Sequence, residues 1–239
     1  MGPSTYNLQC RFCPEMRDDL GLSEFHHLVG HGFGSRFLRQ SDNYVAFPAL
    51  GQIVCGHLLI SPKSHYLSIG QLPAAIIAEL EQFIGSAIDV LAHTYNAPII
   101  MLEHGAASSS KKAGCCVDHM HLHLLPAEID LRHRLSDFYP EMEVDKLTDL
   151  QRYFRAGMSY LFLQDGRGRR FAYEAPIVVS QFLRRIACEE LRLLDRWDWA
   201  ANIDPDNVRQ MLSDLNSWSN VDGPLSFTRT VDYDPTCER

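Results

Sequence analysis

Residues 119–126 read HMHLHLLP, a stretch in which histidine alternates with apolar residues. Successive side chains of a β-strand point to opposite faces of the sheet. His119, His121 and His123 are therefore predicted to share one face, while the intervening apolar side chains pack against a core. Each imidazole brings hydrogen-bonding groups that need partners, so three of them at this spacing are unsuited to filling a core. The pattern indicates either a metal site or a histidine nucleophile oriented by its neighbours.

A small, polar and partly basic loop precedes this stretch, with the sequence EHGAASSSKKAGCC over residues 103–116. Its backbone N–H groups, its hydroxyls and the ammonium groups of Lys111 and Lys112 suit phosphate oxygens. An exposed loop without a ligand is the alternative reading of such a serine run. Because the loop leads into three histidines, we regard phosphate binding as at least equally well supported.

Outside this stretch, hydrophobic periodicity predicts short strands over residues 44–47, 57–61 and 98–102. Apolar residues at helical spacing predict one long helix over residues 71–95 and a second, amphipathic helix over residues 180–194. Strands outnumber helices in the first half of the chain. The expected fold is therefore α+β, with a mostly antiparallel sheet.

Histidine, charge and tryptophan content divide the chain near residue 130. Residues 1–130 hold ten of the eleven histidines and carry a net charge of −5, from 7 Lys and Arg against 12 Asp and Glu. Residues 131–239 carry −3, from 15 against 18, and hold all three tryptophans. No Gly/Ser-rich linker separates the parts. We therefore expect a catalytic domain over 1–130 and a mixed C-terminal extension over 131–239 that packs against it.

The overall composition narrows the classes of partner. The 239 residues carry a formal net charge of −8, which argues against a broad basic surface for duplex nucleic acid or for an anionic membrane. No apolar run is long enough to cross a bilayer, and residues 1–6 lack the pattern of a signal peptide. Seven unevenly spaced cysteines favour a reducing compartment over a disulfide framework. The expected location is the cytoplasm.

Three stretches together resemble the histidine triad (HIT) superfamily of nucleotide hydrolases and transferases. They are the HxHxH pattern at 119–123, the stretch GHLLISPKSH at 56–65 ahead of the long helix, and GCC at 114–116. The GCC stretch is similar to the phosphate loop of the galactose-1-phosphate uridylyltransferase branch. The resemblance covers roughly residues 8–130. It implies a HIT-like antiparallel sheet with one long helix, a nucleotide or nucleotide-conjugate substrate, and, since relatives are commonly dimers, the option of a homodimer.

The resemblance also implies roles for individual residues. The middle triad histidine, His121, would attack the α-phosphorus and form a nucleotidyl-imidazole, while His123 would contact the phosphate oxygens. The backbone N–H groups of Gly114, Cys115 and Cys116 would bind phosphate.

Two differences from the family bear on the substrate and the reaction. Many members carry an acidic residue for the ribose after the first strand, whereas this chain reads FPAL at 47–50, with Phe47 as the nucleotide-side candidate. Histidine rather than glutamine at position 123 favours a hydrolase. A transferase or phosphorylase that passes the nucleotidyl group to phosphate or a sugar phosphate is the alternative. A zinc-stabilised nucleotide-binding protein without catalysis is the non-enzyme alternative.

A Cys-x-x-Cys motif formed by Cys10 and Cys13 has three readings by itself: half a zinc site, a redox dithiol or coincidence. Some relatives of the HIT family hold zinc with such a pair, a histidine from a Ser-Pro-x-x-His stretch and the first triad histidine. The matching positions here are Cys10, Cys13, His65 and His119. The resemblance thus implies one structural Zn²⁺ that tethers the N-terminal arm to the triad and removes His119 from acid–base work.

The second half contains QFLRR at 181–185 and WDW at 197–199, which are similar to the C-terminal extension of some bacterial HIT-like proteins. In the functional interpretation, Gln181, Arg184 or Arg185 reaches the leaving group of the substrate. In the alternative, which we favour at this stage, both arginines are solvated and the tryptophans belong to the core. Ser180 is the expected N-cap of the second helix, and residues 165–170 are expected to form an exposed hairpin turn.

Overall fold

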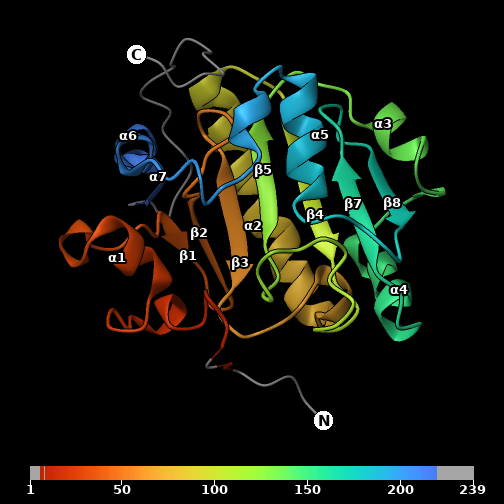
Figure 1. Cartoon of the computed structure of the whole chain (residues 1–239), viewed down its shortest axis with the longest axis horizontal. Helices are drawn as coiled ribbons and strands as arrows, with labels where there is room; N and C mark the ends of the chain where they lie inside the picture. Colours follow the sequence, from red (N-terminus) through yellow and green to blue (C-terminus); the bar gives the residue numbers. More distant parts are fainter. Residues whose placement is uncertain (1–5, 8, 220–239) are drawn as a thin grey trace.

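The computed structural model describes residues 6–7 and 9–219 (Figure 1). Residues 1–5, 8 and 220–239 lie outside the described part, and with them most of the N-terminal stretch on which the expectation of no signal peptide rests. One antiparallel sheet of eight strands runs through the described part, in the order β1-β2-β3-β5-β4-β7-β8-β6. The α+β expectation with an antiparallel sheet and one long helix is confirmed.

The strands are β1 (Arg39–Gln40), β2 (Tyr44–Pro48), β3 (Leu58–Pro62), β4 (Ile99–Gly105), β5 (Leu122–Pro126), β6 (Glu141–Glu143), β7 (Tyr160–Gln164) and β8 (Arg170–Glu174). The α-helices are α1 (Glu24–Val29), α2 (Ala74–Tyr95), α3 (Arg132–Ser136), α4 (Gln151–Arg155), α5 (Phe182–Glu190), α6 (Pro205–Asp214) and α7 (Asn216–Ser219). Short 3₁₀ turns include η1 (Glu15–Arg17), η3 (Ile69–Gln71) and η5 (Leu194–Arg196). Among the described residues, no helix combines the length and apolar character needed to cross a bilayer.

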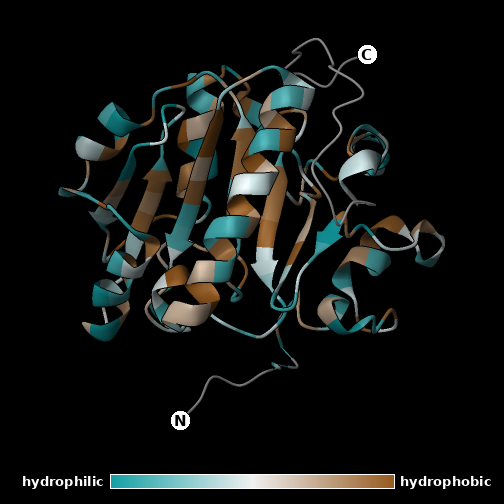
Figure 2. Ribbon diagram, turned by 180° about the vertical axis from the view of Figure 1, so that it is seen from behind, coloured by the Kyte–Doolittle hydropathy of each residue, from teal (hydrophilic) through white to brown (hydrophobic). Residues whose placement is uncertain are grey.

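Helices α2 and α5 lie on opposite faces of the sheet (Figure 1). The alternation of strand side chains divides the core accordingly: Met101 of β4 and Leu124 of β5 pack in the cluster that contains α2, whereas Leu102 and Leu125 pack in the cluster that contains α5. Seen from behind, the central strands are largely hydrophobic, and α2 shows both apolar and polar residues along its length (Figure 2). His123 therefore lies on the face covered by α5.

The triad strand begins later than expected. Strand β5 starts at Leu122, so His119 and His121 lie in the segment before it, with His119 in a bend where its N–H donates to the Val117 carbonyl (2.8 Å). That segment is held by other bonds: the Met120 N–H donates to the Tyr66 carbonyl (2.6 Å), and the Ser61 hydroxyl donates to the Met120 carbonyl (2.8 Å). The prediction that all three histidines share one face of a strand was wrong. His119 is not part of the sheet, and its ring faces Cys10 and Cys13 of the N-terminal segment.

Both predicted helices are shorter than the periodicity suggested. Helix α2 begins at Ala74, with Pro73 in the N-cap position rather than inside the first turn. Helix α5 spans only nine residues, and Gln181, not Ser180, is its N-cap residue. Gln181 adopts a left-handed conformation (φ 59°) because its N–H donates to the carbonyl of Gly114 (2.8 Å). A tertiary contact thus decides where this helix begins.

Strands from beyond residue 130 continue the same sheet. Strand β7 pairs with β4 along its whole length, and β8 returns beside β7. The expected hairpin turn at 165–170 is confirmed, and the Asp165 carboxylate accepts bonds from the Arg167 and Arg169 N–H groups (both 2.9 Å). The division at residue 130 remains a prediction, since the sheet crosses it without interruption.

A buried carboxyl group joins the sheet to η3 on the α2 side. Glu103 of β4 accepts hydrogen bonds from the Ile69 N–H (2.7 Å) and the Tyr160 hydroxyl (2.7 Å). No cation forms an ion pair with it among the described residues. Burial raises the pKa of Glu103 to about 7, against the opposing effect of these two hydrogen bonds. The folded protein therefore holds this proton more tightly than the unfolded chain does.

This difference predicts a pH-dependent stability. As pH rises from about 4.5 to about 7, the unfolded chain has lost the Glu103 proton while the folded protein still holds it, so the free energy of unfolding falls by at most about 3 kcal/mol. Glu103→Gln keeps the group neutral and should flatten this part of the profile. Urea unfolding of both proteins at pH 5 and pH 8 measures the effect. Glu128→Gln, at an exposed glutamate, is the control, and an unchanged slope in Glu103→Gln would contradict the assignment.

Candidate active site

A cavity that is open to solvent lies beside the triad residues His121 and His123. Its walls come from the N-terminal segment, the loop between β2 and β3, strands β3, β4 and β5, the segment before β5, and the segment from Gln181 onward. The lining residues are Arg11, Phe12, Glu15, Glu24, Phe25, Leu28, Arg36, Ala49, Leu50, Gly51, Leu59, His104, Gly114, Cys116, Val117, His121, His123, Gln181, Arg184 and Trp199.

His121 is held in a single tautomer. Its Nδ1 lies 2.7 Å from the carbonyl oxygen of His119, and a carbonyl can only accept, so Nδ1 carries the proton. The lone pair of the neutral ring is then on Nε2. Burial lowers the pKa of His121 to about 4, so the ring is neutral at pH 7. A neutral, oriented imidazole that lines a cavity is a competent nucleophile.

A second histidine, His57 at the end of the loop before β3, fixes the tautomer of His123. The Ile53 N–H donates to His57 Nδ1 (3.2 Å), so the proton of His57 is on Nε2. That Nε2–H donates to His123 Nδ1 (2.9 Å), which leaves Nε2–H as the remaining donor of His123. His121 therefore offers a lone pair and His123 a proton donor. Sequence analysis missed the role of His57, although its place at the head of a predicted strand was visible.

All the imidazoles that serve this cavity are neutral at pH 7. Burial lowers the pKa of His57 and of His123 well below the usual value, and the positive charge of Arg184 lowers both further. Burial likewise lowers the pKa of His104 to about 3. His104 Nε2 accepts a bond from the Leu183 N–H (3.3 Å) at the start of α5. The imidazole rings of these histidines therefore carry no positive charge at pH 7.

The N-terminal segment supplies a wall that sequence analysis did not foresee. Phe12 packs edge-on against His121, with ring centroids 5.6 Å apart. Behind it, Arg36 is buried and makes a two-point ion pair with Glu15, with nitrogen–oxygen distances of 2.7 and 2.8 Å. The Arg36 guanidinium also lies over the rings of Phe25 (4.5 Å) and Phe47 (4.4 Å). No short motif marks this pair, because its members lie 21 residues apart.

The structure brings together some of the predicted phosphate residues. Gly114 and Cys116 line the cavity with His121 and His123. Gly114 needs to be glycine: its φ is +77°, and a Cβ there would lie 2.4 Å from the Val179 carbonyl oxygen.

Four other predicted residues are not among the cavity-lining residues. Phe47 is fully buried in a small core cluster behind Phe12. Lys111 donates to the Gly157 carbonyl, and Lys112 pairs with Asp118 (2.8 Å). The Cys115 thiol is buried and donates to the carbonyl of Val117.

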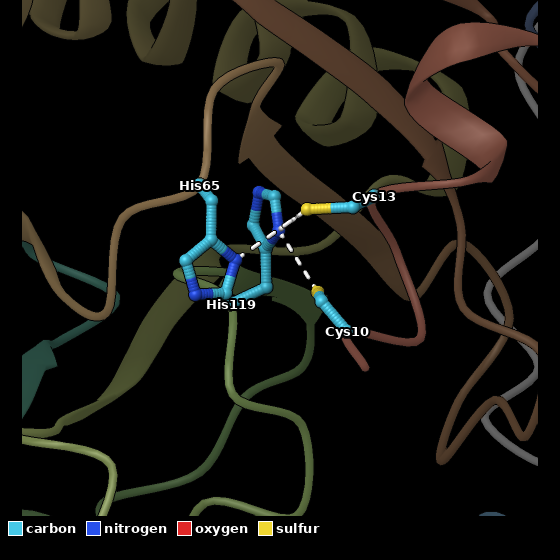
Figure 3. A group of neighbouring side chains, drawn as sticks. All are labelled: Cys10, Cys13, His65 and His119. Atoms are coloured by element: carbon cyan, nitrogen blue, oxygen red, sulfur yellow. Dashed lines mark hydrogen bonds between the residues drawn. The ribbon is translucent and has the colours of Figure 1, made fainter. Parts of the chain in front are cut away.

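A four-residue cluster lies on the other side of His119 (Figure 3). The ligand atoms of Cys10, Cys13, His65 and His119 all lie within 4.8 Å of one another, so the group could hold a metal ion. His119 donates from Nε2 to the Pro62 carbonyl (2.8 Å), which leaves Nδ1 as a lone pair facing the two sulfurs. The interaction between the two thiols lowers the pKa of Cys13, an effect that His119 and His65 strengthen, and raises the pKa of Cys10.

The predicted arginine pair of α5 behaves in two different ways. Arg185 is half-buried: its Nε donates to the Ser180 carbonyl (3.0 Å), and its guanidinium lies over the ring of Trp197 at 3.2 Å. Arg184 is buried and lines the cavity, so the expectation that it is solvated was wrong. The tryptophans also differ, since Trp218 is in the core whereas Trp199 lines the cavity.

Comparison with known proteins places the triad within a recognised domain. Residues 34–129 match the family model described as the HIT domain. The match covers 96 of the 239 residues, less than half of the chain. The matched residues include His57 and the triad, but neither the Cys-x-x-Cys motif nor Arg184.

Several solved structures are similar. They include a Hit-like protein involved in cell-cycle regulation from Bartonella henselae (14% identity, 64% of this chain and 98% of that chain, TM-score 0.41). Others are a member of the HIT family from Bacillus subtilis (17% identity, 62% and 96%, TM-score 0.40) and a HIT family hydrolase from Clostridium thermocellum (19% identity, 50% and 91%, TM-score 0.37).

The buried ion pair in the cavity wall leads to a stability prediction. Glu15→Gln leaves the Arg36 guanidinium buried without a counter-charge and should lower the free energy of unfolding by about 3–5 kcal/mol. Combining it with Arg36→Met should recover much of this loss. Urea unfolding measures both variants. Asp206→Asn, which breaks an exposed pair with Arg209, is the control, and a loss for Glu15→Gln no greater than for this control would contradict the prediction.

Proposed function

We propose that this chain is a HIT-type nucleotide hydrolase that acts at the α-phosphate through a covalent intermediate on His121. The observation that carries the proposal is the 2.7 Å bond between His121 Nδ1 and the His119 carbonyl, which leaves the Nε2 lone pair for the phosphorus. Covalent catalysis divides one difficult displacement into two easier steps.

The neighbours of His121 suit the charge that develops on the phosphate. The Nε2–H of His123, directed by His57, and the backbone N–H groups of Gly114 and Cys116 would donate to the phosphate oxygens. Donors fixed before the substrate arrives need no reorganisation during the reaction. Phe12 and Phe25 offer aromatic faces in the same cavity for the nucleoside, a role for which the sequence had suggested Phe47.

Transfer of the nucleotidyl group to phosphate or a sugar phosphate is the alternative reaction of the same intermediate. Product analysis with and without these acceptors separates the two. A nucleotide-binding protein without catalysis is the remaining alternative, and it predicts no covalent adduct. A homodimer and a cytoplasmic location stay predictions.

The four-residue cluster suits structural Zn²⁺. In a tetrahedral zinc site, bonds of about 2.3 Å to sulfur and about 2.05 Å to nitrogen separate these donor atoms by about 3.5 Å. The observed sulfur–nitrogen distances are 3.3 Å for Cys10 and His119, 3.4 Å for Cys13 and His65, and 3.6 Å for Cys13 and His119. When bound, zinc would hold the N-terminal wall of the cavity against the triad and keep His119 out of proton transfer.

Substitution of the nucleophile tests the proposed reaction. His121→Ala should lower turnover of a nucleotide panel by at least about 10³-fold and abolish the covalent adduct, because no other group supplies the lone pair. Mass spectrometry at alkaline pH, where a phosphorus–nitrogen bond survives, detects the adduct. His133→Ala, at an exposed histidine outside the cavity, is the control. Unchanged turnover in His121→Ala would refute the assignment.

Elemental analysis tests the metal proposal. Protein purified without chelator should contain one zinc per chain, and Cys13→Ser should lose it because three ligands remain. Cys188→Ser, at a buried cysteine outside the cluster, should keep its zinc. A stoichiometry near zero in the unaltered protein would contradict the proposal.

A further inference from the structure

The charges that line the cavity do not cancel. Three arginines and two glutamates line it, which leaves a net charge of +1. Two of the arginines are paired: Arg36 with Glu15 at 2.7 Å, and Arg11 with Glu24 at 3.1 Å. Arg184 forms no ion pair with any described residue. The uncompensated charge of the cavity is therefore on Arg184.

Arg184 is held in place entirely by backbone carbonyls. Its exposure is 4%. Nε donates to Trp197 (2.7 Å), and Nη2 donates to Gly51 (2.8 Å) and Arg196 (2.9 Å). Among the described residues, Nη1 has no hydrogen-bond partner. A buried guanidinium that is fixed by its other nitrogens and still has donors to offer is a suitable anion receptor.

One carboxylate interacts electrostatically with this guanidinium, but its hydrogen bonds go to other groups. Asp198 is the carboxylate whose charge acts on Arg184. Its Oδ1 accepts from the Gln181 amide (3.4 Å) and from the Ala200 N–H (3.1 Å), and no bond joins it to Arg184. The cation therefore lacks a bound counter-ion within the described part of the chain.

The first turn of α5 strengthens the same positive region. Gln181, its N-cap residue, lines the cavity, and the Leu183 N–H points to His104, another cavity residue. The N-terminus of a helix carries a partial positive charge, which favours anions. Because the Leu183 N–H is already bonded to His104, this helix end contributes through its dipole. This helix end and Arg184 lie on the wall formed by residues beyond 180, whereas His123 belongs to β5 and His121 lies just before that strand.

We propose that Arg184 and the first turn of α5 form a second anion subsite, which receives a phosphate of the leaving group. This proposal rests on the proposed function. It narrows the substrate to nucleotides whose α-phosphorus is joined through oxygen to a further phosphate, as in nucleoside diphosphates and triphosphates or their conjugates.

The chemistry of the step fits such a leaving group. The Nε2 lone pair of His121 forms a bond to the α-phosphorus, while the bond from that phosphorus to the bridging oxygen breaks. The electron pair stays on the oxygen of the departing phosphate, whose charge Arg184 offsets, so no proton donor is required. Water then forms the new phosphorus–oxygen bond, the phosphorus–nitrogen bond breaks with its electrons returning to Nε2, and a water proton leaves to solvent.

Two substrates and two variants test this subsite in the full chain. One substrate is a nucleoside 5′-diphosphate, and the other is the matching nucleoside 5′-phosphorimidazolide, whose leaving group carries no phosphate. Both substrates are tested with each of four common bases. Arg184→Gln should lower kcat/KM for the diphosphate by about 10- to 100-fold and for the phosphorimidazolide by less than about threefold. Arg185→Gln, the same change on the next residue and outside the cavity, should alter neither.

An equal loss on both substrates in a folded Arg184→Gln protein, or no loss on either, would overturn the proposal. If that variant does not fold, the test uses the unaltered protein. It should bind inorganic pyrophosphate, as measured by calorimetry, and should prefer the diphosphate to the phosphorimidazolide as a substrate. Formation of the histidine adduct from the phosphorimidazolide, without pyrophosphate binding or diphosphate turnover, would reject the subsite and retain the proposed function. Absence of an adduct from every nucleotide would reject the proposed function. Pyrophosphate binding weakened by Arg184→Gln but not by Arg185→Gln would still support the subsite.

Discussion

The hydrogen bond from His121 Nδ1 to the His119 carbonyl is the interaction on which the rest of the site depends. One residue serves two sites at once, because the His119 ring faces the cysteines while its backbone oxygen sets the tautomer of His121. The position of that oxygen depends in turn on the bond between His119 Nε2 and Pro62. Whatever holds His119 in place therefore also determines which nitrogen of His121 faces the cavity.

Water exclusion shapes the remaining chemistry. Buried imidazoles lose the hydration that stabilises their charged form, so His57, His104 and His123 stay neutral. Arginine keeps its charge under the same conditions, and burial lowers the pKa of Arg184 only to about 10. The cavity thus separates two tasks, with a lone pair and a neutral donor on β5 and the residue before it, and permanent positive charge on α5.

Local sequence patterns predicted the elements whose causes are local. The apolar spacing of residues 71–95 located α2, and the alternation at 119–126 located the triad segment. The resemblance to a known family then brought Cys10, Cys13, His65 and His119 together, as they lie in the structure. The features that the patterns missed depend on contacts between residues far apart in the sequence. Glu15 pairs with Arg36, and β7 pairs with β4. The carbonyls of Arg196 and Gly51, which lie 12 and 133 positions from Arg184, accept hydrogen bonds from its guanidinium. The start of β5 at Leu122 was missed for the same reason, since tertiary bonds from Tyr66 and Ser61 replace the ladder.

The place of β4 in the middle of the sheet has a consequence for the order in which the protein is made. Strand β4 pairs on one side with β5, which follows it closely in the chain, and on the other with β7, whose first residue is Tyr160. During synthesis, the strands up to β5 can assemble while this second edge of β4 is bare, and an apolar, unpaired strand edge is prone to join another chain. A fragment that stops near residue 130 keeps this edge permanently. Residues 160–164 therefore cover this edge of β4, and the part of the chain up to residue 130 depends on the later part to keep it paired.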